Sequence, residues 1–396
     1  MQFTVIGIPD KTNFHFSPDV LDAVSKRNVF SGGKRHYQLV RHILPQNHTW
    51  IDITIPLKNV FEQYMSHEDI VVFASGDPLF FGFANTIKRE LPDAKINLVP
   101  YFNSLQILAH RLVLPYHDMI MVSLTGRPFH EFDRVLIEGK EKIGLLTDKK
   151  NTPKVIAQRM IDYGYTNYEM YIGENLGGEN EVINNFQLKD IKNTQVSDLN
   201  CVILLRTHDR ERLFGIPEEV INILNNRPKM LTKMPIRLLS LSMLNLYSKS
   251  VMWDIGFCTG SVSVEAKMQF PHLKIHAFEK REESRELIKQ NTTKFGTPGI
   301  ESYIGDFFEM DLYDIEKPDA VFIGGHGGRL VEMMGIIKEN IQDNGIVVFN
   351  SVSKSSKDAF LEGVEKYGFT LLKETRITVD EHNPIDTLAA QLITNR

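Results

Sequence analysis

The sequence predicts an α/β protein made of two successive α/β units. Short apolar runs alternate with segments of helical periodicity along the whole chain, which is typical of layered α/β folds. The 396 residues are enough for two or three domains of about 150 residues each. The most informative stretch, Val251 to Glu265, combines a buried strand, a glycine-bearing turn and the start of a helix. Such a turn presents free backbone N–H groups at the carboxyl end of a sheet.

The first unit is predicted from apolar runs that are bounded by turn residues. Its expected strands are Thr4–Ile8, Val71–Ser75, Ile96–Val99, Met119–Leu124, Ile143–Thr147, Met170–Ile172 and Cys201–Leu205. Helical periodicity predicts helices at Phe83–Glu90, Leu105–Arg111, Pro153–Tyr163 and Pro217–Leu224. The last of these helices falls in a polar stretch from Thr207 to Lys233, which we interpret as the junction between the units.

The second unit begins with a predicted helix, Leu238–Leu246, that leads into the strand before Asp254. Further strands are expected at Ile275–Phe278, Ser302–Ile304, Ala320–Ile323, Ile346–Phe349, and in a terminal pair near Thr370–Thr378 and Thr387–Thr394. An antiparallel terminal pair on a mainly parallel sheet is typical of a methyltransferase fold.

The composition argues against several classes of function. The net charge of −5 and the scattered basic residues do not indicate nucleic acid or a membrane surface as a partner. Cys201 and Cys258 are too few and too far apart for a disulfide framework or a C-x-x-C site, and no metal-ligand set is visible. The N-terminus lacks the features of a signal peptide, and no apolar stretch approaches the ~18 residues of a membrane-spanning helix. We therefore expect a reducing cytoplasm as the location.

The turn DIGFCTG has the features of a nucleotide site. Gly256 lets the backbone approach a ligand, and Gly260 permits close packing at the start of the helix. Glu279 ends the next apolar run, 25 residues past Asp254, where an acid can accept a hydrogen bond from a ribose. The glycine spacing differs from G-x-G-x-x-G, which disfavours an NAD-dependent dehydrogenase. It resembles the first motif of the S-adenosylmethionine (SAM) methyltransferases, although a plain strand-to-helix turn is the simpler alternative.

Two further loops follow strands of the second unit. Gly305-Asp306 lies at the corner that holds the adenine in such folds, or else the acid only caps a helix. The run PDAVFIGGHGG ends an apolar strand in four glycines around His326, which could bind a carboxylate or move a proton, or could simply be exposed. Asn350 ends the following strand near the same edge.

The first half contains its own ordered series of turn motifs. The sharpest is Ser75-Gly76-Asp77-Pro78 after a buried strand, which taken alone is an ordinary turn. It is accompanied by Val29–His36 (VFSGGKRH), Leu98–Gln106 (LVPYFNSLQ), Val122–Arg127 (VSLTGR), Leu145–Asp148 (LLTD), Asn151–Pro153 (NTP) and Gly173–Gly178 (GENLGG).

In order and spacing, this series resembles the tetrapyrrole methylases of corrin biosynthesis, in particular the CbiE type. The part from Lys229 onward resembles the partner CbiT type, through Thr232-Lys233, DIGFCTG, Gly305-Asp306 and the glycine loop. The order is that of the fused CbiE/CbiT, or CobL-like, methyltransferases. The resemblance implies a two-lobed tetrapyrrole-methylase domain at 1–206, a linker at 207–228, and a Rossmann-like class I SAM-methyltransferase domain at 229–396.

The resemblance also implies two SAM sites and a tetrapyrrole substrate. For the first site it implies Gly7, Gly76, Asp77, Leu79, Asn103, Ser104 and Leu146. For the second it implies Thr232, Asp254, Gly256, Phe257, Cys258, Thr259, Gly260, Glu279, Asp306 and Phe307. The implied reaction is methylation of a precorrin-6 or its cobalt form at carbon 5 by the first domain and at carbon 15 by the second, with loss of CO₂ from an acetate side chain. These families tend to form homo-oligomers.

The many carboxylates of such a substrate require cationic or polar groups at the pocket rims. The candidates are Arg35, His36, Arg127, His130, Arg237, Arg329 and Lys354, each of which could instead be a solvated surface charge. His326 and Asn350 are the catalytic candidates. Methyl transfer itself needs mostly in-line positioning, because the sulfonium of SAM is already a strong electrophile.

The chain departs from the family pattern in both halves. Gly7 is followed by Ile8-Pro9-Asp10 where the family tends to carry more glycines, and Phe257 and Cys258 stand where small residues are usual. Phe257 is expected to narrow the pocket or to stack on the cofactor. Two rival hypotheses therefore stay open: an enzyme that acts on another tetrapyrrole, and a scaffold in which only the C-terminal domain is active.

Overall fold

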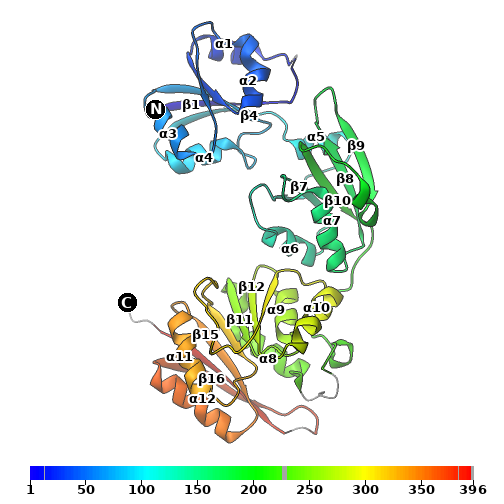
Figure 1. Ribbon diagram of the computed structural model, residues 1–396, viewed down its shortest axis with the longest axis vertical. Coiled ribbons are helices and arrows are strands. Elements are labelled where there is room, and N and C mark those ends of the chain that lie inside the picture. Colours follow the sequence, from blue (N-terminus) through cyan, green and yellow to red (C-terminus); the bar gives the residue numbers. More distant parts are fainter. Residues whose placement is uncertain (13, 225–229, 382, 394–396) are drawn as a thin grey trace. The chain divides into compact units, whose positions relative to one another are not determined.

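The computed structural model describes residues 1–12, 14–224, 230–381 and 383–393. It divides into two compact units, one made of residues 1–127, 141–158 and 168–207, and the other of residues 128–140, 159–167 and 208–396. Figure 1 labels the helices and strands of both units. The end of the predicted linker (225–228) and the predicted start of the second domain at Lys229 lie outside the described residues.

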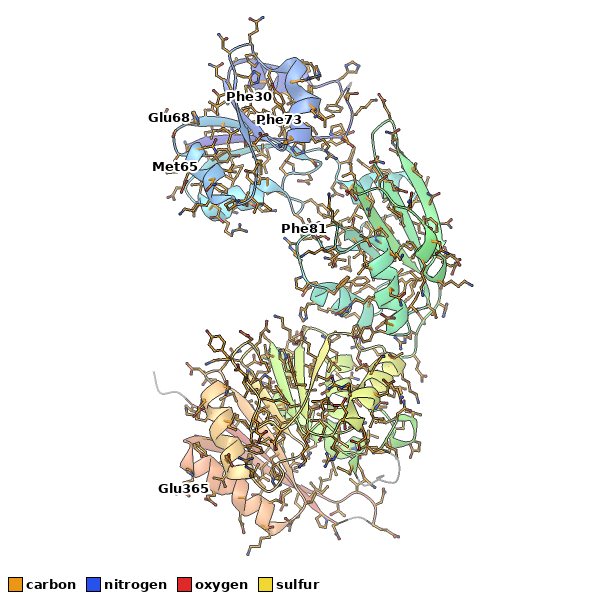
Figure 2. All side chains as sticks on the ribbon, viewed as in Figure 1. Phe30, Met65, Glu68, Phe73, Phe81 and Glu365 are labelled. Atoms are coloured by element: carbon orange, nitrogen blue, oxygen red, sulfur yellow. The ribbon has the colours of Figure 1, made fainter. Side chains whose placement is uncertain are left out.

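The first sheet of the N-terminal unit is parallel throughout, in the order β3-β2-β4-β1-β5. Its strands are β1 (Gln2–Ile8), β2 (Val29–Gly32), β3 (Thr49–Asp52), β4 (Asp69–Ser75) and β5 (Lys95–Val99). The accompanying helices are α1 (Pro18–Ser25), α2 (Lys34–Val40), α3 (Lys58–Tyr64) and α4 (Phe83–Glu90), with a short 3₁₀ turn at Arg41–Ile43. Phe30 and Phe73, labelled in Figure 2, stack between β2 and β4 with ring centroids 6.3 Å apart and anchor one face of the core.

The next sheet is mixed, in the order β6-β7-β10-β8-β9, with only β6 and β7 parallel. Its strands are β6 (Ile120–Ser123), β7 (Lys142–Leu146), β8 (Tyr168–Glu174), β9 (Val182–Gln187) and β10 (Asn200–Arg206). The helices in this part of the chain are α5 (Ser104–Arg111), α6 (His130–Ile137), α7 (Pro153–Asp162) and the 3₁₀ segment Leu188–Asn193. The two sheets together match the predicted two-lobed organisation of this half.

The C-terminal sheet has seven strands in the order β13-β12-β11-β14-β15-β17-β16. The strands are β11 (Val251–Ile255), β12 (Lys274–Glu279), β13 (Ile300–Ile304), β14 (Ala320–Ile323), β15 (Ile346–Ser351), β16 (Phe369–Ile377) and β17 (Ile385–Leu392). The helices are α8 (Met234–Leu244), α9 (Ser261–Gln269), α10 (Glu283–Phe295), α11 (Leu330–Asn340) and α12 (Lys354–Lys366), with 3₁₀ turns at Glu218–Val220 and Leu246–Ser248. The predicted antiparallel terminal pair is confirmed, since β17 runs antiparallel to both β15 and β16.

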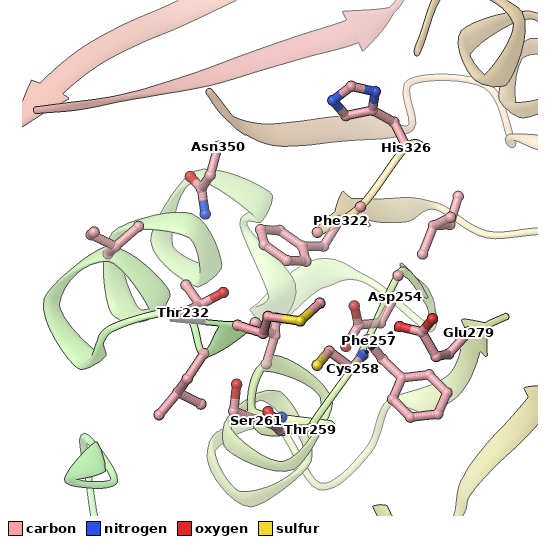
Figure 3. A pocket seen from close by; sticks show the side chains of 18 of the residues that line it. Thr232, Asp254, Phe257, Cys258, Thr259, Ser261, Glu279, Phe322, His326 and Asn350 are labelled. Atoms are coloured by element: carbon pink, nitrogen blue, oxygen red, sulfur yellow. Dashed lines mark hydrogen bonds between the residues drawn. The ribbon is translucent and has the colours of Figure 1, made fainter. Parts of the chain in front are cut away.

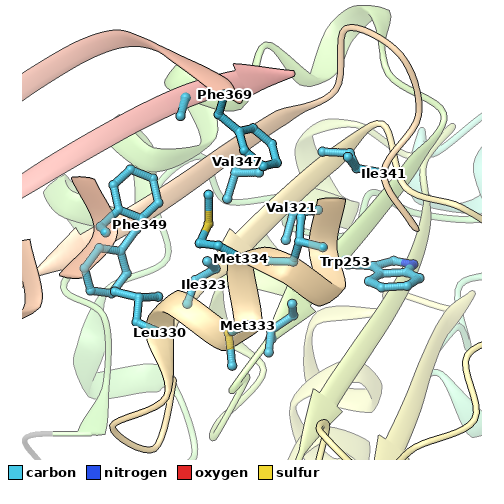
Figure 4. Packing of buried hydrophobic residues seen from close by; sticks show 14 of the residues in the cluster. Trp253, Val321, Ile323, Leu330, Met333, Met334, Ile341, Val347, Phe349 and Phe369 are labelled. Carbon is cyan, nitrogen blue, oxygen red and sulfur yellow. The ribbon is translucent and has the colours of Figure 1, made fainter. Parts of the chain in front are cut away.

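Alternation along β11 assigns its side chains to two layers. Trp253 packs with Val321 and with Met333 of α11 on one face, as Figure 4 shows. Met252 faces the opposite layer, which α8 and α9 cover. Because successive side chains of a strand point to opposite faces, Asp254 follows Met252 into the second layer. The strand therefore ends with a carboxylate on the α8 and α9 side of the sheet.

The predicted helix Pro217–Leu224 is wrong. The structure has only a 3₁₀ turn at Glu218–Val220 there. Ile216 and Ile221 are buried against Val264 and Met268 of α9, so tertiary packing holds the segment irregular and overrides its local helical pattern. No helix among the described residues is both long and apolar enough to cross a membrane.

Candidate active site

A cavity of about 1330 Å³ lies at the carboxyl ends of β11, β12, β14 and β15. Many of the side chains that line it are drawn in Figure 3. The predicted residues that line it are Thr232, Asp254, Gly256, Phe257, Cys258, Thr259, Glu279, Asp306, Phe307, His326, Arg329 and Asn350. Sites for one small ligand usually measure about 300–1,000 Å³, so this cavity has room for a cofactor and part of a second ligand.

The floor of the cavity is set by the glycine turn after β11. Gly256 has φ +78°, and a Cβ atom built there would lie 2.5 Å from the backbone N of Gly325. The turn and the loop after β14 therefore approach each other along their backbones, which only glycine permits. Gly260 serves a different purpose: its Cβ would lie 2.7 Å from the Ile288 side chain, and it does not line the cavity. The structure shows the close packing that the sequence predicts for Gly260, here of α9 against α10, and does not place this glycine on the cavity wall.

Phe257 and Cys258, the two unusual residues of the turn, have different roles. Phe257 is buried and packs with Ala277 and Ile288, so its ring is used mostly in the core behind the turn. Cys258 has φ +49° and donates its backbone N–H to Glu279 Oε2 at 3.0 Å. The backbone of Cys258 thereby ties the turn to the end of β12.

Glu279 is held in one orientation by backbone and side-chain donors. Oε1 accepts hydrogen bonds from the backbone N–H of Lys280 (2.9 Å), from that of Arg281 (3.2 Å) and from Arg281 Nη1 (2.9 Å). Oε2 accepts the bond from Cys258 and retains capacity for another donor. A carboxylate fixed in this way at the edge of the cavity suits a diol such as that of a ribose.

Asp254 is fully buried, and only one of its two carboxylate oxygens has a hydrogen-bond partner among the described residues. Oδ2 accepts hydrogen bonds from the backbone N–H of Ser263 (3.2 Å) and from its Oγ (2.5 Å), whereas Oδ1 has no partner in the described part of the chain. Burial, and then the charge of Glu279, raise the pKa of Asp254 to about 7. A buried unpartnered carboxylate oxygen at a cavity wall calls for a donor or a cation from a ligand.

His326 and Asn350 lie on the loop after β14 and at the end of β15, on the same side of the cavity in Figure 3. His326 Nδ1 accepts the backbone N–H of Gly328 at 3.2 Å, so the neutral ring carries its proton on Nε2. Burial lowers the pKa of His326, which favours this neutral form. The site therefore offers a neutral imidazole N–H and a neutral amide as hydrogen-bonding groups.

The remaining lining residues divide between rim and wall. Arg329 pairs with Glu332, and its guanidinium lies over the Phe308 ring, 3.8 Å from the centroid. Asp306 Oδ1 accepts the N–H of Phe308 at 3.1 Å, and Phe307 is buried beside the Trp253 ring, with centroids 6.2 Å apart. Asp306 is thus a turn-capping acid at the corner predicted for an adenine.

Arg237 does not lie on the rim, in contrast to its predicted role as a substrate contact. It is completely buried and forms an ion pair with Glu265, whose side chain is also fully buried. Nη1 donates to the carbonyl oxygen of Thr232 at 2.7 Å, and Nη2 donates to that of Ile216. The guanidinium of Arg237 binds internal partners among the described residues and fixes the Thr232 segment, so its N–H groups are not available to a substrate.

In the N-terminal unit, the predicted glycines bring strand ends and a helix start together. A Cβ atom at Gly7 would lie 1.9 Å from the carbonyl oxygen of Gly76, and one at Gly76 (φ +60°) would lie 2.9 Å from Asn103 Cα. Asn103 caps α5, because its Oδ1 accepts the N–H of Gln106 at 2.9 Å. The ends of β1 and β4 and the start of α5 therefore meet at one place.

The other predicted residues of this half lie on the loop after β4, on α5, on β7 and after β6. Asp77 Oδ1 accepts the N–H of Leu79 (2.8 Å), and Leu79 itself is exposed. Ser104 begins α5, and Leu146 ends β7. Arg127 lies over the ring of Phe81, which is labelled in Figure 2, at 5.0 Å from the centroid.

Arg35 and His36 of α2 converge on Ser75 at the end of β4. Ser75 Oγ lies 3.0 Å from Arg35 Nη2 and 2.9 Å from His36 Nε2. The N–H of Gly33 donates to His36 Nδ1 at 3.2 Å, and burial, then the charge of Arg35, lower the pKa of His36 to about 4. The neutral ring therefore carries its proton on Nε2, and Ser75 Oγ accepts two hydrogen bonds, which leaves its own proton for another acceptor.

Each half of the chain is similar to a known family of proteins. A model of the tetrapyrrole (corrin/porphyrin) methylases matches residues 4–192, and a model of the precorrin methyltransferase domain matches residues 225–391. A precorrin-6Y C(5,15)-methyltransferase [decarboxylating] of Sinorhizobium sp is 28% identical over 96% of this chain and 91% of its own length. A probable cobalt-precorrin-6B C(15)-methyltransferase (decarboxylating) of Sulfolobus acidocaldarius is 31% identical over 40% of this chain and 81% of its own length.

The chain belongs to the precorrin-6Y C5,15-methyltransferase family. A cobalt-precorrin-7 C(5)-methyltransferase of Salmonella typhimurium is similar to part of it, with 27% identity over 51% of this chain and 98% of that protein. Relatives of one half thus occur as separate proteins, whereas the Sinorhizobium relative spans both halves.

The sequence motifs do not identify several residues that hold the site together. Ser75 stood inside a recognised motif, but only the fold shows that two side chains from α2 bind its hydroxyl. Ser263 and Arg281, which hold Asp254 and Glu279, follow their partners by nine and two residues. Ser263 lies in the first turn of the helix that follows the strand of Asp254, and that position is the sequence signal for it. Among the described residues no group of three or more His, Cys, Asp or Glu side chains is placed to hold a metal ion.

Proposed function

We propose that the chain is a bifunctional SAM-dependent methyltransferase of corrin biosynthesis. The N-terminal unit would methylate carbon 5 of a precorrin, and the C-terminal unit would methylate carbon 15 and remove CO₂ from an acetate side chain. The names of the relatives support this division, since the C15-specific proteins are named for cobalt-precorrin-6B and the C5-specific ones for cobalt-precorrin-7. That numbering also supports the order, C15 before C5.

The observation that carries the proposal is the unpartnered carboxylate oxygen of Asp254 beside the fixed carboxylate of Glu279, at a turn that only glycine can form. These groups fit SAM, which bears an ammonium group and a ribose diol. When bound, SAM supplies a methyl group on a sulfonium. The protein's part is then to place the acceptor carbon in line with that methyl group and to exclude water. Asp254 and Glu279 orient the cofactor, and His326 and Asn350 face the substrate.

A second SAM site in the N-terminal unit is part of the proposal. The backbones of Gly7, Gly76 and Asn103 approach one another closely at the ends of β1 and β4. Ligands bind at the carboxyl ends of the strands in such sheets. Arg35 and Ser75 would contact substrate carboxylates, and His36 would orient the Ser75 hydroxyl.

Product analysis by mass spectrometry tests the function. Incubation of the chain with precorrin-6Y and SAM should yield a product with two added methyl groups and without one CO₂. One added methyl group with CO₂ loss would support the rival in which only the C-terminal unit is catalytic. Equilibrium dialysis with labelled SAM should give two bound molecules per chain, and one would favour the scaffold.

Replacement of Asp254 by asparagine is expected to weaken SAM binding and to stabilise the ligand-free protein. A hydrogen bond to a charged group contributes about 1.5–3 kcal/mol, so the KM for SAM in CO₂ release should rise about 10-fold to 100-fold at pH 8. The measurement is the initial rate of CO₂ release as a function of SAM concentration. An unchanged KM would show that this carboxylate does not face the cofactor.

The stability effect of the same substitution depends on pH. The pKa of Asp254 lies near 7 in the folded chain, above its unfolded value of 3.8, so ionisation destabilises the fold progressively as the pH rises from about 4 to 7. The carboxamide of the D254N variant cannot ionise. The Tm of this variant relative to that of the wild type should therefore rise over this range and then level off above pH 7. A constant difference in Tm would contradict the raised pKa.

Replacement of Ser75 by alanine is expected to slow methylation at carbon 5 about 10-fold, since it removes one oriented hydrogen-bond donor. The rate is measured on a precorrin-7-type tetrapyrrole with SAM. CO₂ release from precorrin-6Y should not change. Ser25, an exposed serine at the end of α1 whose hydroxyl bonds to the carbonyl oxygen of Asp22, is the matched control. Equal rates for the S75A and S25A variants would exclude a substrate contact by Ser75.

A further inference from the structure

Three polar side chains from three different elements meet inside the C-terminal unit. Asn350 is the last but one residue of β15, Thr387 lies directly opposite it on the antiparallel strand β17, and Ser240 lies on α8. Ser240 and Thr387 are both completely buried, whereas Asn350 is half-buried and lines the active-site cavity. Two hydroxyls buried at this place would each carry a desolvation cost if they had no partner.

Hydrogen bonds join the three side chains, and Ser240 Oγ lies near both polar atoms of the Asn350 amide, 2.9 Å from Nδ2 and 3.2 Å from Oδ1. Thr387 Oγ1 donates to Asn350 Oδ1 at 2.9 Å, and Asn350 Nδ2 donates to Ser240 Oγ at 2.9 Å. The nearer acceptor for the proton of Ser240 is the carbonyl oxygen of Ile236, one turn earlier on α8, at 2.8 Å, and the farther one is Asn350 Oδ1 at 3.2 Å. The amide is therefore fixed at both its oxygen and its nitrogen.

One N–H group of the Asn350 amide remains for a hydrogen bond to a ligand in the cavity. A carboxamide has two N–H donors, and only one of them is bound to Ser240. Because Thr387 binds the amide oxygen and Ser240 binds one N–H, the second N–H of Asn350 is the group that can bind a ligand. A free amide could flip by exchanging its oxygen and nitrogen. Ser240 Oγ lies near both of these atoms, whereas Thr387 donates to the oxygen, so Thr387 is the contact that distinguishes the two ends.

We propose that Ser240 and Thr387 are positioning residues that hold the Asn350 amide so that its second N–H binds a carboxylate of the tetrapyrrole in the C-terminal site. The inference rests on the proposed function. A neutral donor suits a carboxylate that must lose its charge as CO₂ departs, because a cation would stabilise the charged reactant more than the transition state. His326, the other neutral donor of this wall, is consistent with the same requirement.

Replacing Thr387 by valine tests the proposal, since valine keeps the shape and removes the hydroxyl. The kcat for CO₂ release from precorrin-6Y should fall at least about 10-fold, because misplacement of a contact group lowers the rate strongly. The KM for SAM should stay unchanged, and so should methylation at carbon 5. The T387S variant, which restores a hydroxyl, should recover most of the rate. The matched control is T297V: Thr297 is equally buried in the same unit, and its hydroxyl has no partner among the described residues.

A double-mutant cycle separates positioning from simple structural support. In an N350A background the T387V substitution should cost nothing further, because Thr387 acts only through Asn350. An equal loss in both backgrounds, or a T387V variant as fast as the T297V control, would overturn the inference while leaving the function intact. A wild-type chain that releases no CO₂ from precorrin-6Y would overturn the proposed function and this inference with it.

Discussion

Replacing Gly256 by alanine is expected to lower methylation at carbon 15 and CO₂ release by about 100-fold or more, since a displacement of about 1 Å at a site costs that much. The added Cβ would lie 2.5 Å from the backbone N and 2.7 Å from Cα of Gly325. Backbone atoms cannot turn away as a side-chain tip can, so the turn after β11 and the loop after β14 must separate. That movement displaces the Cys258 N–H from Glu279 and disturbs the wall beside His326.

The measurement is the rate of CO₂ release from precorrin-6Y over a range of SAM concentrations. Gly368 provides the matched control, because its φ of +71° is similar and an added Cβ there would meet no described atom within 4 Å. The G368A variant carries the backbone strain of about 1–2 kcal/mol without the collision. Methylation at carbon 5 should persist in both variants. A G256A variant as active as G368A would show that the cavity does not depend on this close approach.

The parts of the fold that were predictable are those in which local pattern and tertiary packing agree. Trp253 and Asp254 alternate between the two faces of β11 as a period of two requires, and the glycine turn follows from residue type alone. The motif acids Asp254 and Glu279 therefore lie where the sequence placed them. Ile216 and Ile221 show the opposite case, since burial against α9 cancelled a local helical preference.

The parts of the site that were not predictable depend on pairs that are distant in sequence. Thr387 meets Asn350 because β17 is antiparallel to β15 in a particular register, and no spacing in the chain encodes that register. Arg237 looked like any other cation available to a substrate, because its acid, Glu265, lies on a neighbouring helix. Charge identifies candidates, but only packing decides whether a charge faces a ligand or the interior.

Replacing Arg237 by methionine is expected to destabilise the C-terminal unit by about 3–5 kcal/mol, because it leaves a buried carboxylate without its counter-charge. Among the described residues, Glu265 would keep the N–H groups of Gly215 (3.0 Å) and Ile216 (2.8 Å) and the amide of Gln269. The chain has two tryptophans, and Trp253 lies in the core of this unit. In a W50F background, the urea-unfolding curve of Trp253 fluorescence therefore reports on the C-terminal unit alone.

A second change distinguishes charge burial from lost packing. The R237M/E265Q double variant should recover part of the stability, since a glutamine is neutral and still offers an oxygen to the backbone of the 215–216 loop. The control is R285M, which removes an exposed ion pair with Glu282 and should leave the unfolding curve unchanged. Because Arg237 also binds the carbonyl oxygen of Thr232, the R237M variant should raise the KM for SAM. A double variant no more stable than R237M would show that the guanidinium acts through its bonds to Thr232 and Ile216, not by neutralising Glu265.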